Sequence, residues 1–152
     1  MPDNLSPEQR AYCMSRIKGK DTGLERMVRS ELHKRGLRFR KHLKRLPGKP
    51  DIVFSSAKVA VFVDGDFWHG YRFPSWRHKV SAFWQRKIEK NRRRDVRNFD
   101  ALRSRGWMVI RIWEHKTESD FGACVARIAD AVTNRNRLAL LNHTGRGDES
   151  AG

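Results

Sequence analysis

Apolar residues recur along this chain with the spacing of amphipathic helices in some segments and of strands in others. A capping box at residues 22–25 and a glycine at position 36 bound the clearest helix. Its apolar stripe comprises Leu24, Met27, Val28 and Leu32. A serine followed by a proline and a glutamine predicts a second, short basic helix at residues 6–18.

Two further helices are predicted in the second half of the chain. The longer one spans about residues 81–105 and ends at Gly106. The residues expected on its inner face are Trp84, Ile88, Val96, Phe99 and Leu102. The last helix begins at Ser119, and its apolar residues are Phe121, Cys124, Val125, Ile128 and Val132. Beyond about Thr133 the apolar pattern fades, which predicts a disordered tail.

Short runs rich in β-branched residues predict the strands. Residues 51–54 and 58–63 flank a Ser-Ser-Ala turn and have the outline of a β-hairpin, while residues 37–41 and 107–113 predict two more strands. The long helix then connects the third strand to the fourth. Because such crossovers are right-handed and join parallel strands, the order predicts an α/β fold with a mixed sheet flanked by helices.

Composition narrows the class of partner. The chain has 152 residues, which suits one compact domain, and its 38% apolar content makes wholesale disorder unexpected. It carries 33 Lys and Arg against 17 Asp and Glu, a formal charge of +16. A surface this basic predicts a polyanionic partner, nucleic acid above all. Charge alone also fits a basic ribosomal or chromatin-type protein without catalysis, so only a catalytic site distinguishes an enzyme.

The cysteines, the N-terminal segment and the lengths of the apolar runs indicate the cellular compartment and the parts of the chain. Cys13 and Cys124 have no second Cys or His at metal-ligand spacing, so both are expected to be reduced thiols. The N-terminus lacks a secretory signal, and no apolar run approaches the roughly 18 residues of a membrane span. We expect a cytoplasmic, nucleoid-associated monomer without membrane contact. Its predicted parts are a helical arm at residues 1–20, the main domain at 21–133 and a flexible tail at 134–152.

The segment VFVDGDFWHG at residues 61–70 sets acids and a histidine directly after an apolar strand. In the predicted hairpin Asp51 starts one strand, while Asp64 and Asp66 follow the end of its partner, so these carboxylates are expected to converge. Converging carboxylates bind Mg²⁺, which stabilises the charge that grows during phosphodiester cleavage. His69, close behind, is suited to act as a general base at neutral pH.

Each of these residues also has an ordinary structural explanation. Asp51 after a proline fits the start of a strand, Asp64 before a glycine fits a turn, and Glu25 fits a capping box. The combination of acids at both ends of a hairpin, an adjacent histidine and a basic surface favours a nuclease site over these separate explanations.

Two bulky aromatics, Phe67 and Trp68, lie in a polar loop where periodicity does not place core residues. Proteins that distort a duplex insert such side chains between base steps, at a cost in unstacking that is least at a mismatched pair. Trp84 is a candidate third member of this wedge, although a place in the helix core explains it equally well.

Taken together, these residues resemble the very-short-patch (Vsr) mismatch repair endonucleases, which have the restriction-endonuclease-like fold. The similarity covers most of the chain and includes LPGKPD at residues 46–51 and FVDGDFWH at residues 62–69. Within these segments PGKPD and FWH, in this order and spacing, are the most specific. Members of that family nick one DNA strand on the 5′ side of the thymine in a T:G mismatch. The resemblance therefore implies a Mg²⁺-dependent, strand-nicking endonuclease whose substrate is mismatched double-stranded DNA.

Roles at the catalytic site follow from the resemblance by position. It implies that Asp51 is the principal Mg²⁺ ligand and that the Val63 carbonyl is a further ligand. It also implies that His69 is the general base for the attacking water. Glu25 resembles the family's acid that supports this histidine and the metal-bound water.

The resemblance also implies the DNA contacts. Phe67, Trp68 and Trp84 are expected to form an aromatic wedge on the major-groove side, and Met14 to probe from the minor groove. The basic residues expected on the DNA backbone are Lys20, Lys49, Arg92 and Arg93.

Three segments depart from the family pattern. Val63 and Asp64 replace a threonine-histidine pair, and if Asp64 faces the site it adds a metal ligand or alters phosphate contacts. The family often holds a structural zinc ion in this region, but no cysteine lies there and His115 alone does not make such a site. We predict no structural zinc, with packing of Tyr71, Phe73 and Trp76 in its place. The segment between His69 and Trp84 also differs, which leaves the preferred sequence context open.

Two other hypotheses remain at this point. The first is a nuclease of the same fold that acts on matched, branched or otherwise damaged DNA, in the company of a restriction-modification system. The second is a DNA-binding protein that does not cleave. The sequence does not indicate partner repair proteins or the number of metal ions.

Overall fold

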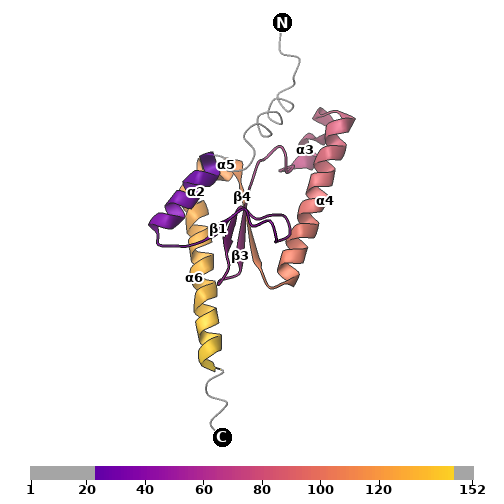
Figure 1. The fold of residues 1–152 in the computed structure, drawn as a ribbon. Helices are drawn as coiled ribbons and strands as arrows, with labels where there is room; N and C mark the ends of the chain where they lie inside the picture. Colours follow the sequence, from indigo (N-terminus) through magenta and orange to yellow (C-terminus); the bar gives the residue numbers. More distant parts are fainter. Residues whose placement is uncertain (1–22, 146–152) are drawn as a thin grey trace.

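A four-stranded mixed sheet forms the centre of the molecule (Figure 1). The computed structural model describes residues 23–145 of the chain, so the predicted helix at residues 6–18, with Met14 and Lys20, lies outside the described residues. The strands, in spatial order, are β1 (Arg40–Lys41), β2 (Ile52–Phe54), β3 (Val59–Asp64) and β4 (Met108–Trp113). The first three pair antiparallel, and β3 pairs with β4 in parallel.

The predicted hairpin and crossover are both confirmed. β2 and β3 pair in the register Ile52 with Val61, and α4 (Ala82–Ser104) carries the chain from β3 to β4. Ser81 caps α4, since its hydroxyl accepts a hydrogen bond from the Trp84 N–H. This α/β arrangement, a mixed sheet flanked by helices, is the one expected of the restriction-endonuclease-like fold.

Helices cover both faces of the sheet. α2 (Gly23–Lys34) and α6 (Phe121–Gly145) lie on one side, and α4 lies on the other (Figure 1). Val59 and Val61 of β3 belong to the core beneath α2 and α6, whereas Ala60 and Phe62 pack with Phe99 of α4. The central strand is therefore buried on both faces, and each fully buried aliphatic side chain contributes about 1.5 to 3 kcal/mol to burial.

Two apolar residues assigned to inner helix faces prove to be exposed. Met27 is 53% exposed and Val96 is 58% exposed. On α4 the buried stripe instead includes two polar residues, Asn91 and Asp95. Asn91 donates a hydrogen bond to the loop that follows β3, and Asp95 accepts one from Arg111 of β4. The pattern of apolar residues alone does not predict that polar residues on the buried side of a helix form hydrogen bonds there.

The structure also differs from the predictions in element lengths. β1 has two residues where a longer strand at 37–41 was expected. The short helices α3 (Phe73–Trp76), η1 (Arg77–Lys79) and α5 (Glu114–Ser119) were not predicted. α6 continues past Thr133 to Gly145, because the Arg, Leu and Ala residues there favour a helix even without a buried apolar face. Within the described residues no helix is long and apolar enough to cross a membrane.

The side chain of Arg135 ties α6 to the turns at one end of the sheet. Its guanidinium donates hydrogen bonds to the carbonyls of Ala57, Lys58 and Gly106. These carbonyls belong to the hairpin turn and to the turn that precedes β4. One side chain thus joins three segments that are distant in sequence.

Replacing Arg135 with Met should lower the free energy of unfolding by about 1 to 3 kcal/mol, because charge-assisted hydrogen bonds to three carbonyls are lost. Urea unfolding followed by circular dichroism measures this change. The matched control is Arg137→Met, an exposed position on the same helix. Equal stability of both variants would show that the Arg135 contacts do not stabilise the fold.

Candidate active site

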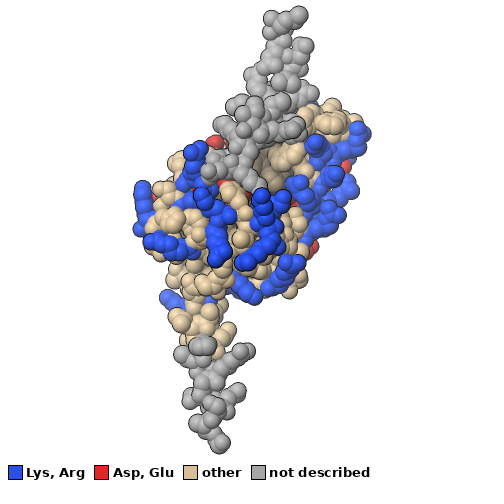
Figure 2. Space-filling model, in the orientation of Figure 1, with Lys and Arg blue, Asp and Glu red and all other residues tan. Residues whose placement is uncertain are grey.

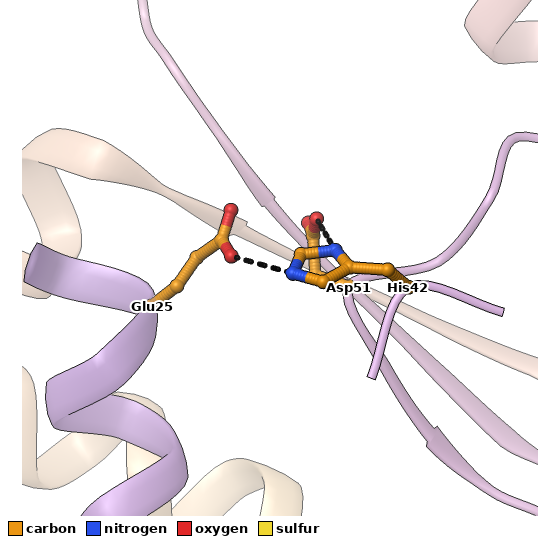
Figure 3. A group of neighbouring side chains, drawn as sticks. All are labelled: Glu25, His42 and Asp51. Carbon is orange, nitrogen blue, oxygen red and sulfur yellow. Dashed lines mark ion pairs between the residues drawn. The ribbon is translucent and has the colours of Figure 1, made fainter. Parts of the chain in front are cut away.

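One group of polar side chains joins α2 to the sheet and consists of Glu25, His42 and Asp51 (Figure 3). Glu25 lies in the first turn of α2, and Asp51 directly precedes β2. His42 stands between them, with Nε2 3.6 Å from Glu25 Oε2 and Nδ1 3.7 Å from Asp51 Oδ1. One potential ligand atom from each residue lies within 4.8 Å of the others, so the three residues could hold a metal ion.

Strand pairing fixes Asp51 from two sides. Its carboxylate Oδ2 accepts a hydrogen bond from the Val63 N–H at 2.7 Å. Its carbonyl accepts one from the His42 N–H at 3.2 Å. Both neighbours belong to backbone that is paired with β2, so the carboxylate has little freedom to turn away.

Glu25 is more buried than a helix-capping residue needs to be. It is only 4% exposed, and its carboxylate forms an ion pair with Arg29 one turn later in α2, at 3.3 Å. A carboxylate that serves only as a cap normally remains in contact with water at the helix end. The burial of Glu25 beside His42 instead places it in the group described above.

His42 is a site residue that the sequence analysis missed. β1 and β2 pair Lys41 with Ile52, so the next positions outward, His42 and Asp51, face each other. The sequence analysis predicted strands at residues 37–41 and 51–54 but did not predict that they pair. Antiparallel pairing of these two strands places position 42 beside position 51 and would have identified His42 as a neighbour of Asp51.

A second group surrounds His69 and consists of Asp64, His69 and Asp95. His69 Nδ1 lies 2.7 Å from Asp95 Oδ2 on α4, and His69 Nε2 lies 3.4 Å from Asp64 Oδ1 at the end of β3. Arg111 of β4 donates to both carboxylates, at 2.8 Å each. The imidazole is therefore held between two acids that a guanidinium links.

The burial of this second group has an electrostatic consequence. Asp64 and Asp95 are 5% and 6% exposed. Burial raises the pKa of the Asp64 carboxyl above its ordinary value, while the neighbouring His69 and Arg111 oppose that rise. Arg111 is itself enclosed, with its guanidinium 4.1 Å from the centre of the Trp113 ring.

The convergence predicted for the hairpin acids is wrong in detail. Asp51 and Asp64 belong to different groups, since the partners of Asp51 come from the α2 side and those of Asp64 come from α4 and β4. Side chains alternate between the two faces of a sheet, so Asp64 points to the face opposite that of Val63. Asp66 lies apart from both groups and pairs with His115 at 2.8 Å.

The partners of Glu25 and His69 also differ from those implied by the family resemblance. The histidine that the structure pairs with Glu25 is His42, and the acids it pairs with His69 are Asp64 and Asp95. Asp95 and Arg111 were not identified as site residues from the sequence. Their signals were a polar residue on the inner stripe of a helix and a lone cation within an apolar strand.

The loop between β3 and α3 carries His69 and is folded by its own backbone. The N–H groups of His69, Gly70 and Tyr71 donate to carbonyls at positions 65, 67 and 66. Buried Asn91 of α4 donates to the Trp68 carbonyl at 3.1 Å. Gly70 has a φ of +69° and lies so close to α4 that an added Cβ would stand 2.8 Å from Ile88 Cγ2. The loop is thus docked on α4.

Phe67 and Trp84, two of the predicted wedge residues, are in contact. Their ring centres lie 5.8 Å apart, and Phe67 also stacks on Trp76 at 5.5 Å. Trp76 was not predicted as part of this cluster. Trp84 is only 8% exposed and contacts Phe67 edge-on, so Phe67 packs against a buried ring. Trp68 is half-buried and lies near Lys87, whose Nζ is 5.8 Å from the ring centre.

Rings fill the region where the family often holds zinc. Tyr71 packs against His115 with ring centres 4.3 Å apart and against Trp113 at 4.9 Å. Phe73 packs edge-on against Trp76, whose Nε1–H donates to the Tyr71 carbonyl at 2.8 Å. The packing expected of Tyr71, Phe73 and Trp76 is present, and the absence of zinc stays a prediction.

Basic side chains cover the face drawn in Figure 2, from the region of α2 across to α4, with few acids among them. Lys49, Arg92 and Arg93 are exposed as expected of DNA-backbone contacts. Arg93 also pairs with Glu89 at 3.7 Å, and the Arg92 guanidinium lies 5.7 Å from the Phe73 ring centre. These contacts leave both charges at the surface.

Comparison with known proteins gives consistent matches. The profile of the family described as "DNA mismatch endonuclease Vsr" matches residues 2–75. The chain is 47% identical to "Type II nicking enzyme V.XorIIP" of Xanthomonas oryzae pv. oryzae, over 87% of this chain and 98% of the relative. It is 38% identical to "Type II nicking enzyme V.NmeDIP" of Neisseria meningitidis serogroup C, over 90% and 95%. It is 36% identical to "DNA mismatch endonuclease Vsr" of Escherichia coli, over 75% and 74%.

The close approach of Gly70 to α4 gives a stability prediction. Gly70→Ala should lower the free energy of unfolding by about 1 to 3 kcal/mol, because the added Cβ meets a buried β-branched side chain and the backbone has a positive φ. Gly122→Ala is the control, since nothing lies within 4 Å of a Cβ added there. Its stability should be unchanged or higher, and an equally stable Gly70→Ala variant would contradict the docking of the loop. Chemical denaturation of both variants supplies the measurement.

Proposed function

Because the chain belongs to the Vsr family of DNA mismatch endonucleases, and so is a DNA endonuclease, we propose that it nicks duplex DNA on the 5′ side of the thymine in a T:G mismatch, with Mg²⁺ as cofactor. The observation that carries the proposal is the bond between the Asp51 carboxylate and the Val63 N–H. It joins the acid that fits a metal ligand to the strand end from which the histidine and the aromatic loop emerge. Asp51 and the loop that carries His69, Phe67 and Trp68 thus lie at the same end of the hairpin.

The donor set of the first group fits a divalent cation. Asp51 and Glu25 offer carboxylate oxygens, which hard divalent cations prefer, and the buried ring nitrogens of His42 have no hydrogen-bond partner in the described residues. In this proposal Asp51 is the principal ligand and the Val63 carbonyl a further one, as in the family. The cation, when bound, stabilises the charge that grows on the phosphate and on the leaving oxygen.

The second group is less suited to that cation. Both of its carboxylates are bonded to the guanidinium of Arg111, which supplies the positive charge. In the first group Glu25 is likewise paired with Arg29, but Asp51 accepts its hydrogen bond from the neutral Val63 N–H. Asp64 is therefore assigned to His69 and not to the metal. This assignment replaces the expectation that Asp64 adds a ligand next to Asp51.

His69 has the geometry of a general base held by an acid. Its Nδ1–H donates to Asp95 at 2.7 Å, which fixes the ring and its tautomer and leaves Nε2 to take up the proton of the attacking water. The imidazolium that forms then lies between two carboxylates, and their charges stabilise it. Asp95 acts in this step through the histidine, as a positioning residue.

The aromatic cluster supports action at a distorted base pair. Phe67 rests on Trp76 and Trp84, so it would be supported when pressed into a base stack. Unstacking costs a few kcal/mol and is cheapest at a mismatch, which favours T:G over T:A. Trp68 joins the wedge from the same loop, and Met14 is assigned to the minor groove by family position. We expect a monomer acting on chromosomal DNA in the cytoplasm.

The names of two relatives favour a second candidate function. They are called type II nicking enzymes, which fits an endonuclease that accompanies a restriction-modification system and recognises a particular sequence context. Such an enzyme need not require a mismatch. Comparison of matched and mismatched substrates in several flanking sequences separates the two candidates.

A labelled duplex with one T:G pair, beside its T:A counterpart, tests the proposal. We expect Mg²⁺-dependent nicking of the T:G duplex only, lost with EDTA, and a rate at least about 10²-fold lower for Asp51→Asn and for His69→Gln. Asp130→Asn and His33→Gln, at exposed positions, should retain the wild-type rate. Equal nicking of both duplexes would favour the second candidate, and nicking unaffected by Asp51→Asn would contradict the assigned metal site.

The role of Asp95 can be tested separately from binding. Asp95→Asn should reduce the single-turnover nicking rate by about 10² to 10⁴-fold, because the amide no longer fixes the tautomer of His69. The affinity for the uncut T:G duplex, measured by fluorescence anisotropy in Ca²⁺, should stay within about twofold of wild type. Asp100→Asn on the exposed side of α4 is the control. A parallel loss of affinity and rate would mean that Asp95 serves the fold and not the base.

A further inference from the structure

His42 has buried ring nitrogens that make no hydrogen bond. Both Nδ1 and Nε2 are inaccessible to solvent and without a hydrogen-bond partner in the part of the chain that the structure describes. The nearest acids, at 3.6 Å and 3.7 Å, are beyond hydrogen-bond distance yet face the two nitrogens directly (Figure 3). Leaving a buried polar atom unpaired destabilises the fold, so such an atom calls for an ion or a water between it and its neighbours.

The backbone of His42 has an uncommon conformation that fixes the position of the ring. His42 has a φ of +48°, a conformation that residues other than glycine adopt at a cost. Its N–H is bonded to the Asp51 carbonyl, so the ring cannot leave Asp51 without breaking the end of the sheet. Strain at a position that holds an imidazole against two carboxylates is typical of a functional site.

We propose that His42 is a direct ligand of the divalent cation: its Nδ1 binds the ion held by Asp51, while its Nε2–H donates to Glu25. The inference rests on the proposed function, in which Asp51 holds the cation, and adds a nitrogen ligand to that site. A histidine that binds a metal through one nitrogen regularly donates its other N–H to a carboxylate, which orients the ring. Glu25 is then the acid that orients His42.

The separations are close to those of a shared ion. Ligand atoms about 2.1 Å from an octahedral cation lie about 3.0 Å apart when they are adjacent. The Nδ1 to Oδ1 separation of 3.7 Å exceeds this value by about 0.7 Å. The two atoms would therefore approach each other by that amount on binding one ion.

A nitrogen ligand changes which metals the site prefers. Mg²⁺ favours a shell of oxygens, whereas imidazole raises affinity for first-row transition ions such as Mn²⁺ and Co²⁺. The protein should therefore bind Mn²⁺ more tightly than Mg²⁺, and replacing His42 with Gln, which offers an oxygen, should reduce that preference by about tenfold or more. The competing arrangement is a water that bridges His42 to the acids without contact to the metal.

Pulsed electron paramagnetic resonance of bound Mn²⁺ distinguishes the two arrangements, because it detects nitrogen bonded directly to the ion. The full chain is loaded with Mn²⁺, alone and with uncut T:G duplex. Labelling the histidines with ¹⁵N separates their signal from that of DNA bases. The variants are His42→Gln, His69→Gln, Asp51→Asn and the exposed control His33→Gln, each checked for folding by circular dichroism and for Mn²⁺ and Mg²⁺ affinity by calorimetry.

The expected result is a histidine nitrogen coupling in the wild type that persists in His69→Gln and His33→Gln and vanishes in His42→Gln. A coupling that survives in His42→Gln, or none in the wild type, would overturn the inference while leaving the metal site intact if Asp51→Asn abolishes binding. Mn²⁺ binding that Asp51→Asn does not weaken would instead refute the metal site itself. The two failures are thus distinguishable.

Discussion

Burial of β3 on both faces is the constraint on which the rest of the molecule depends. As the central strand it bonds to β2 on one side and β4 on the other, and its alternating side chains must satisfy two helical layers at once. A shift of one residue in its register would exchange every side chain between the layers. The same alternation, continued to the strand end, directs Asp64 toward α4. Asp51 is held differently, because its carboxylate accepts a hydrogen bond from the Val63 backbone N–H and contacts His42 beyond the end of β1. The division of the polar residues into two groups therefore depends on where each strand ends as well as on alternation.

The elements governed by local patterns could be predicted, and those governed by pairing could not. The hairpin, the crossover helix and the parallel fourth strand follow from apolar periodicity, turns and handedness, and all are present. His42, Asp95 and Arg111 come from three separate elements and meet the site only through strand register and helix packing. Their types are common on surfaces, and the signals that they carry, an inner-stripe position for Asp95 and an apolar strand around Arg111, do not by themselves show which residues they meet. Val96 and Met27 failed in the opposite way, because both are apolar at helical spacing yet more than half exposed.

The buried charges around His69 are costly for stability and useful for positioning. Removing carboxylates and a guanidinium from water costs several kcal/mol per ion, and pairing repays this only when the geometry is good. Here Arg111 bonds to both acids and stacks on Trp113, so its hydrogen bonds link three elements. An apolar replacement of similar volume would pack as well but would not define the orientation of an imidazole. The network is best explained as support for one side chain in one orientation.

The loop that carries His69 illustrates how a short irregular segment is made rigid. Loops are ordinarily the mobile part of a domain, yet a base and a wedge must keep fixed positions. Three independent contacts supply the rigidity: Gly70 against α4, the Asn91 amide on the Trp68 carbonyl, and Asp66 with His115 beneath Tyr71. The last of these joins the loop to α5, because His115 lies in that helix. The ring of Tyr71 packs on His115 and on Trp113, so the ion pair is covered by aromatic side chains. The segment that follows this anchor carries Trp76, which stacks on Phe67. The contacts that fix the loop therefore also fix the aromatic cluster expected to meet DNA.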